Sequence, residues 1–183
     1  CYNSIPQKGY VYYFFDPLIT ACSDDGWSSE EVQGTAIQGA YSGNASASGH
    51  PIRDMHDGHG SSNNAYWSRY WQQIRLCNQF LENIDNAAVH SETERARFKA
   101  EAHVLRAYFY SELIKWFGKL PIVDKTIEFD ADFSTLRREK VYDVVKFIAS
   151  DCEAAISCNE LPWRITTDDE AMRATKALAW AIT

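Results

Sequence analysis

The sequence predicts an all-α fold in which helical repeats are separated by long irregular loops. Apolar residues recur every three or four positions in several segments, which is the spacing of one face of an α-helix. Capping boxes, the pattern that starts many helices, occur at Ser91-Glu-Thr-Glu94 and Thr167-Asp-Asp-Glu170. Segments with the alternating pattern of a strand are few or absent, so we expect helices to form the core.

The first third of the chain predicts one short helix followed by a long loop. Asp16-Pro17 combines an N-cap residue with proline at the first helical position, so a helix should run from there toward Cys22. From about residue 26 to residue 64 the sequence is rich in Gly, Ser, Asn, Asp and His without a sustained period. Loops of this length are usually functional or disordered.

The middle of the chain predicts two helices that pair in antiparallel fashion. The first runs from about Asn64 to Asp85, and the second follows the capping box at Ser91. Gly118 provides a left-handed C-terminal cap for the second helix, and Pro121 prevents the helix from resuming. The apolar stripes of the two helices are Trp67, Trp71, Ile74, Asn78, Leu81 and Ile84, and Phe98, Ala102, Leu105, Phe109, Leu113 and Trp116.

The last third predicts an extended segment from Leu120 to Phe133 and a second helix pair. One helix carries the stripe Val141, Val144, Val145, Ile148, Cys152 and Ala155, and the capping box at Thr167 opens the other. The sequence thus predicts helix pairs at about 64–117 and 136–183. Each pair is too small to bury its own apolar face, which is typical of helical-repeat proteins. Because the Ala-rich pattern reaches Thr183 without a cap, we expect residues 1–183 to be the N-terminal portion of a single domain.

Composition excludes several classes of partner. The formal net charge of -7 comes from scattered acidic residues, so the sequence predicts no basic surface for binding nucleic acid. No stretch of about 18 apolar residues is present, so the sequence predicts no membrane-spanning helix. The five cysteines contain no C-x-x-C pair, which indicates small core residues rather than a zinc ribbon or a disulfide framework.

Chemistry-bearing residues gather in the loop of about residues 26–64. The motifs of common enzyme classes are absent from the sequence, so we expect neither catalysis nor a cofactor. One hypothesis is a divalent metal site if the loop folds back on itself, although the spacing favours a solvated polar loop. The side chains of that cluster are His50, Asp54, His56, Asp57 and His59.

The same loop also has the composition of a sugar-binding surface. Trp27 and Tyr41 could stack on the C–H faces of sugar rings, while Asn44, Asp54 and His59 form hydrogen bonds with hydroxyl groups. Outside the loop, Arg106 lies in the middle of a helix between two packed faces. Its guanidinium is either a buried anchor for a carboxylate, or it reaches the surface at the end of a buried aliphatic stem.

The run from Ala100 to Val123, AEAHVLRAYFYSELIKWFGKLPIV, resembles the characteristic helix and turn of the SusD/RagB family of outer-membrane nutrient-binding lipoproteins. Further pieces resemble that family in the same order along the chain. They are Asp24-Asp25; Trp67 with Ile74 and Asn78; Arg138 with Val141-Tyr142 and Asp151; and Arg173-Ala-Thr-Lys176.

The resemblance implies a tetratricopeptide-like scaffold that is anchored by lipid to the outer membrane and faces outward. Such a protein binds glycans, or in some members peptides, and passes them as a lid to a SusC-like TonB-dependent transporter. Cys1-Tyr-Asn-Ser-Ile5 resembles the first helix of the family, so we expect the anchor cysteine upstream, outside this chain. Two alternatives stay open: a helical-repeat scaffold for another protein, and a metal-dependent enzyme that uses the loop from His50 to His59.

Overall fold

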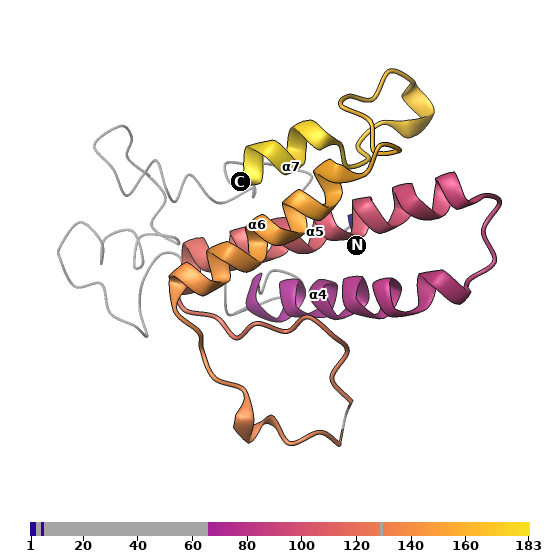
Figure 1. The fold of residues 1–183 in the computed structure, drawn as a ribbon. Helices are drawn as coiled ribbons and strands as arrows, with labels where there is room; N and C mark the ends of the chain where they lie inside the picture. The colour runs from indigo at the N-terminus through magenta and orange to yellow at the C-terminus, as the bar shows by residue number, and fades with distance from the viewer. Residues whose placement is uncertain (3–4, 6–65, 129) are drawn as a thin grey trace, which may run out of the picture. The chain divides into compact units, whose positions relative to one another are not determined.

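The computed structural model describes residues 1–2, 5, 66–128 and 130–183, and the regular elements within these ranges are all helical (Figure 1). The α-helices are α4 (Tyr66–Asn83), α5 (Glu92–Phe117), α6 (Val141–Ser157) and α7 (Lys176–Ile182), with 3-10 turns at Ile84–Asn86, Phe133–Thr135 and Asp168–Glu170. The all-α prediction is confirmed for this part of the chain. The predicted helix that begins at Asp16 and the predicted loop of residues 26–64 lie outside the described residues.

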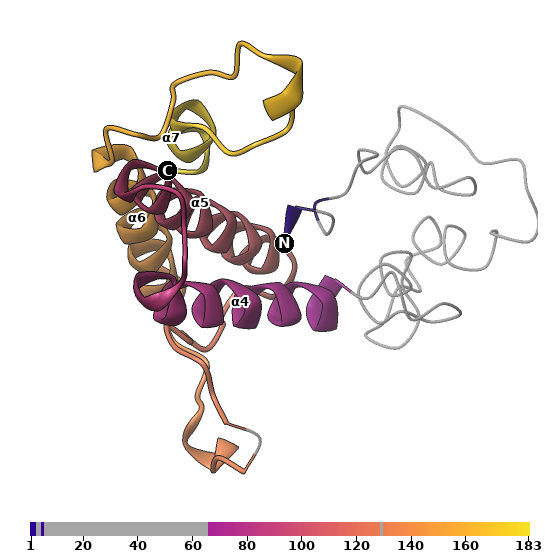
Figure 2. The same cartoon turned by 90° about the vertical axis from the view of Figure 1, so that its right-hand side faces the viewer.

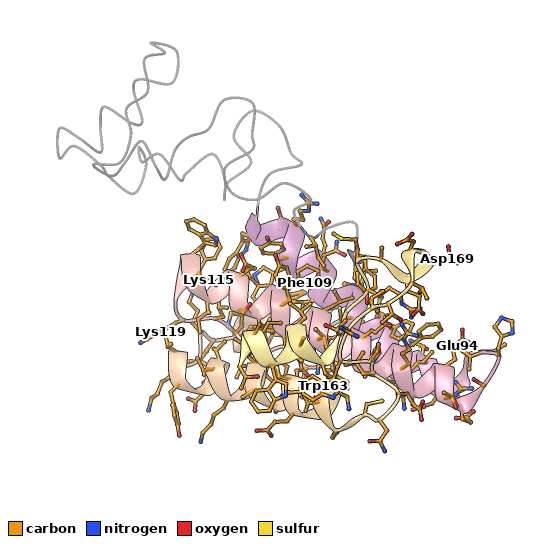
Figure 3. The ribbon with its side chains drawn as sticks, turned by 90° about the horizontal axis from the view of Figure 1, so that it is seen from above. Glu94, Phe109, Lys115, Lys119, Trp163 and Asp169 are labelled. Atoms are coloured by element: carbon orange, nitrogen blue, oxygen red, sulfur yellow. The ribbon has the colours of Figure 1, made fainter. Side chains whose placement is uncertain are left out.

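Helix α5 is the centre of the packing. Its buried positions include the four consecutive residues Val104 to Ala107, so the middle of the helix has no solvent-facing side. In Figures 1 and 2, α4 lies on one side of α5 while α6 and α7 lie on the other. Phe109 is fully buried among these helices, whereas Lys119 lies at the edge of the bundle (Figure 3). A helix that is surrounded on all sides is expected to be largely apolar in its middle.

Both ends of α5 follow the predicted signals. The Ser91 hydroxyl accepts a hydrogen bond from the backbone N–H of Glu94 at 3.1 Å, and the Glu94 carboxylate accepts one from the N–H of His90 at 3.1 Å. At the other end, Gly118 has φ +66° and ψ -108°, and its N–H donates to the carbonyl of Ile114 at 3.0 Å. The positive φ of Gly118 is as predicted. Its ψ is negative, which differs from the positive ψ of the usual left-handed cap.

Helix α4 packs on α5 through a face that is rotated relative to the predicted stripe. Tyr70, Ile74 and Cys77 are buried, and the Tyr70 ring lies 5.5 Å from the Phe109 ring, centroid to centroid. Trp71 is only half-buried and meets the Tyr110 ring edge-on, with centroids 5.7 Å apart. Trp67 and Trp71 of the predicted stripe are therefore both partly exposed, and the buried face of α4 runs along Tyr70, Ile74 and Cys77.

The last two helices correct two further predictions. Val144 and Ile148 are buried on α6, but Val141 and Val145 are 44% and 47% exposed, and Asp151 takes a buried place instead. Thr167 forms no side-chain cap. The cap of α7 is Thr175, whose hydroxyl accepts from the N–H of Leu178 at 3.2 Å, because Met172 has φ +72° and prevents a helix from running on from Glu170.

Candidate functional site

The segment that follows α5 is held in place almost entirely by side chains. It leaves the turn at Gly118 and begins with Leu120, which is fully buried and whose carbonyl accepts a hydrogen bond from the N–H of Glu139 at 2.9 Å. The next residues, Val123 to Ile127, belong to no helix or strand, include a bend at Lys125, and are called the clamped segment below. No strand pairs with this segment within the described residues, so its backbone polar groups need other partners.

Those partners come from α4 and α5. The amide Nδ2 of Asn78 donates to the carbonyls of Val123 and Lys125 at 3.0 and 3.1 Å. The N–H of Val123 donates to the hydroxyl of Tyr110 at 2.8 Å. Further bonds join Asp124 O to Arg106 Nη1 at 3.1 Å, Thr126 N to Glu82 Oε1 at 2.7 Å, and Ile127 O to Arg75 Nη1. The clamped segment is thereby fixed at each of its five residues.

A buried ion pair stands behind the clamped segment. The Nε and Nη2 of Arg106 donate to the two carboxylate oxygens of Asp151 at 2.8 and 2.7 Å, in the bidentate geometry that suits this pair. Arg106 also donates from Nη1 to Asn78 Oδ1 at 2.7 Å, and His103 Nδ1 lies 2.7 Å from Asp151 Oδ1. This network connects α4, α5, α6 and the clamped segment. Of the two alternatives for Arg106, the buried anchor for a carboxylate is confirmed.

The electrostatics of the network keep it charged. Burial alone would raise the pKa of Asp151, but the hydrogen bonds from Arg106 and His103 outweigh burial and hold the pKa below its usual range. Burial alone would lower the pKa of Arg106, and the contact with Asp151 reverses that direction. Because the Asp151 carboxylate stays ionised and already accepts three hydrogen bonds, it is a structural group and not a base that is ready to take a proton.

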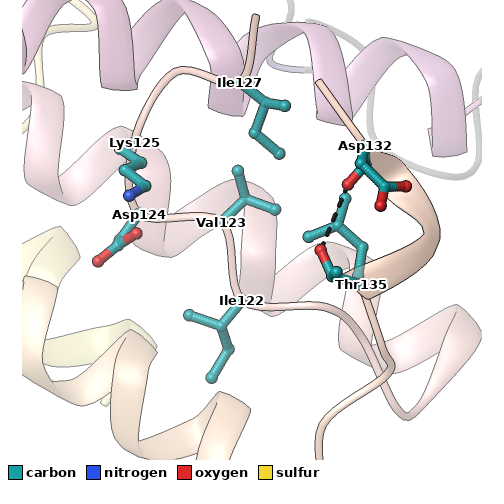
Figure 4. Close-up of a pocket in the computed structure, with 8 residues that line it drawn as sticks. Ile122, Val123, Asp124, Lys125, Ile127, Asp132 and Thr135 are labelled. Atoms are coloured by element: carbon teal, nitrogen blue, oxygen red, sulfur yellow. Dashed lines mark hydrogen bonds between the residues drawn. The ribbon is translucent and has the colours of Figure 1, made fainter. Parts of the chain in front are cut away.

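The outer side of the clamped segment borders a surface hollow of about 210 Å³ (Figure 4). It is lined by Ile122, Val123, Asp124, Lys125, Ile127, Asp132, Thr135 and Leu136. Two of these residues are joined within one turn, where Thr135 Oγ1 donates to the carbonyl of Asp132 at 3.3 Å. Sites that enclose a small molecule usually measure about 300–1,000 Å³. The hollow is therefore smaller than such a site, and its lining contains no nucleophile paired with a base.

The residues that the sequence predicted for ligand binding lie outside the described residues. They are Trp27, Tyr41, Asn44, Asp54 and His59, and the proposed metal cluster of His50, Asp54, His56, Asp57 and His59 lies outside as well. Within the described part, no group of three or more His, Cys, Asp or Glu residues is placed to hold a metal ion. None of the helices described there has both the length and the apolar character needed to cross a membrane.

Two members of the buried network were not recognised as such from the sequence. Asn78 and Asp151 occupy positions four after Ile74 and three after Ile148, which places each on the buried face of its helix. A polar side chain at such a position needs a partner, because an unpaired buried polar group is costly. That signal was present in both helices, although it did not identify Arg106 as the partner.

Several solved structures resemble this chain, although no curated protein sequence matches it. Among solved structures, a SusD-like protein from Bacteroides fragilis NCTC 9343 is 27% identical with a TM-score of 0.59, over 72% of this chain and 27% of that one. A laminarin-binding SusD-like protein is 26% identical with a TM-score of 0.64, over 81% and 29% of the two chains.

Surface glycan-binding protein A from Bacteroides fluxus is 25% identical with a TM-score of 0.56, over 64% of this chain and 24% of that one. The chain thus spans only about a quarter of the length of these proteins. Their similarity confirms the expected tetratricopeptide-like helical fold. A model of the SusD-like family, described as starch-binding and associating with the outer membrane, matches residues 20–183. This chain belongs to the SusD-like family of glycan-binding proteins.

Proposed function

We propose that this protein captures glycans, or alternatively oligopeptides, at the outward face of the outer membrane and delivers them to a SusC-like TonB-dependent transporter as its lid subunit. The observation that carries the proposal is the family match over residues 20–183, together with similar structures that are named for binding glycans. In this proposal the protein acts by binding and not by catalysis, and a lipid anchor upstream of this chain attaches it to the membrane.

The described residues suit a protein that holds ligand-binding loops on a fixed frame. The network of Arg106, Asp151 and Asn78 fixes the clamped segment against two helices, so the frame loses little conformational freedom when a ligand binds. The locked state of the Asp151 carboxylate also argues for a structural role at this place. The ligand contacts themselves are proposed to come from the loop of residues 26–64.

Within that loop, Trp27 and Tyr41 are proposed to stack on sugar rings while Asn44, Asp54 and His59 form hydrogen bonds with hydroxyl groups. Aromatic side chains are suited to this task because their faces contact the C–H surfaces of a sugar. The loss of one buried stacking ring should cost about 1–3 kcal/mol, which lowers affinity about tenfold or more.

A glycan array followed by calorimetry on the purified protein tests the site. Laminarin oligosaccharides are the first probes, since one similar protein is named for binding laminarin. Trp27→Ala should lower the affinity for the best glycan at least tenfold. The matched control is Trp163→Ala, which removes a tryptophan that is 58% exposed in the described part and should leave affinity unchanged. Equal affinities for the wild type and both variants would remove Trp27 from the site.

Purification from native membranes tests the partner. Under the lid proposal the protein is recovered with a large β-barrel transporter, and deletion of the protein reduces uptake of the bound glycan. Recovery with a different protein and normal uptake would favour the alternative of a helical-repeat scaffold. Stoichiometric metal in elemental analysis would favour the enzyme alternative that rests on the loop from His50 to His59.

A further inference from the structure

Two cysteines that are far apart in the sequence meet at the surface of α4. The Sγ atoms of Cys1 and Cys77 lie 3.7 Å apart although 76 positions separate the residues, and both thiols are free. The Cys1 thiol also approaches the carbonyl of Gln73, one turn before Cys77, at 4.0 Å. We propose that Cys1 and Cys77 form a disulfide bond, which joins the ends of the chain between them into a covalent loop. This inference does not depend on the proposed function.

The position of Cys1 is set by its neighbour and not by the thiol contact alone. The Tyr2 hydroxyl donates to Glu101 Oε2 at 2.8 Å and accepts from the N–H of Ala174 at 2.9 Å. Glu101 is buried on α5 and is itself held by Arg97 at 3.1 Å and by Arg173 at 2.7 Å. Tyr2 is therefore fixed between α5 and Ala174, just before α7, and Cys1 is held beside α4.

The geometry allows the bond with a small movement. Disulfide sulfurs are about 2.05 Å apart, so the two Sγ atoms must approach by roughly 1.7 Å. Cys1 is exposed, and its side chain can rotate toward Cys77, which is only 1% exposed. The buried helix residue can therefore stay in place while the exposed one moves.

The chemistry is ordinary thiol–disulfide exchange with an external disulfide such as oxidised glutathione. The Cys1 thiolate attacks one sulfur of glutathione disulfide, and one glutathione leaves as its thiolate. Cys77 then loses its proton and attacks the Cys1 sulfur, which releases the second glutathione. Two protein thiols are oxidised to one disulfide and one glutathione disulfide is reduced to two thiols. Burial raises the pKa of the Cys77 thiol to about 12, so Cys1 is the thiol that reacts first.

The bond would constrain a large part of the chain. It joins the ends of a stretch that includes positions 27 to 59, where the proposed glycan contacts lie. Closing so long a loop restricts the unfolded chain much more than the folded one, which stabilises the folded protein. The oxidised protein should therefore melt several degrees above the reduced protein.

Thiol counting on the purified protein tests the proposal. The protein is equilibrated in reduced or oxidised glutathione buffer, denatured in acid, and labelled with a maleimide for mass measurement. The sequence has five cysteines, so five labels are expected after reduction and three after oxidation. Peptide mapping without reduction should recover Cys1 linked to Cys77.

Two variants separate this pair from the other cysteines. Cys1→Ser, at an exposed residue that does not endanger folding, should keep four thiols in both buffers and lose the redox-dependent change in melting temperature. The matched control is Cys158→Ser, whose thiol donates to the carbonyl of Ala96 at 3.5 Å, and it should go from four thiols to two. Five thiols in the oxidised wild type, a link between other cysteines, or a lipid on the Cys1 sulfur of the native protein would each overturn the proposal.

Discussion

Replacing Asp151 with asparagine tests the buried network behind the clamped segment. The Asp151 side chain is 4% exposed and that of Arg106 is 7% exposed, so the guanidinium has little water to replace a lost partner. Asparagine keeps the size of the side chain but removes the charge and turns an N–H₂ donor toward other donors. Breaking one partner of a buried pair usually costs about 3–5 kcal/mol, and we expect a loss of free energy of unfolding in that range.

The assay is urea unfolding of the purified protein followed by circular dichroism, with the slope compared between variants. The matched control is Asp85→Asn, which removes a carboxylate that is 61% exposed and pairs with Lys99 on the surface. That change should cost at most about 0.5 kcal/mol. In an Arg106→Met background, Asp151→Asn should cost much less, because no buried guanidinium remains unpaired. A cost for Asp151→Asn below about 1 kcal/mol in the wild-type background would refute the reasoning.

The same variant predicts a pH dependence. Although burial alone would raise it, the pKa of Asp151 is lowered in the folded protein by Arg106 and His103. The ionised carboxylate therefore contributes stability that is fully present above the unfolded-state value of about 3.9 and is lost as the pH falls through the lower folded-state value. The stability difference between wild type and Asp151→Asn should be full at neutral pH and shrink below about pH 4. A difference that stays constant down to pH 2 would contradict this explanation.

Two further predictions concern the ends of α5, and both are measured by the same urea unfolding. Ser91→Ala removes the hydroxyl that caps the N–H of Glu94 and should cost about 1 kcal/mol, whereas Ser150→Ala on the exposed side of α6 should be close to neutral. Gly118→Ala should cost about 1–3 kcal/mol, because φ is +66° there. An added Cβ at Gly118 would meet no atom within 4 Å, so a cost near zero would show that the backbone relaxes freely.

Much of the helical framework could be predicted because its signals are local. The capping box at Ser91, the stop at Gly118 and the periodicity of α4 and α6 act over a few residues, and the structure places helices accordingly. The failures were at the boundary of α7, on the exposed side of α6 and at the partly exposed tryptophans of α4. Thr167 and Glu170 have the form of a capping box, but a box needs a helix to follow, and the positive φ of Met172 interrupts it.

The buried site could be predicted only in part. The mid-helix position of Arg106 indicated a carboxylate partner, yet periodicity alone could not select Asp151 on another helix from the other acids of the chain. The clamped segment was predicted to be extended, but its attachment to Asn78 and Tyr110 depends on how α4 and α5 lie beside it. The proposed glycan residues remain predictions, since they lie outside the described residues.

By itself the sequence determined the helical class, the ends of α5 and the family, because each of these rests on residues close together in the chain or on a long ordered motif. Tertiary structure alone decided which polar groups meet inside. Arg106 and Asp151 are separated by 45 positions, and Cys1 and Cys77 by 76. Contacts over such distances are set by the packing of whole helices, whose free energy is spread over many side chains and leaves no local pattern.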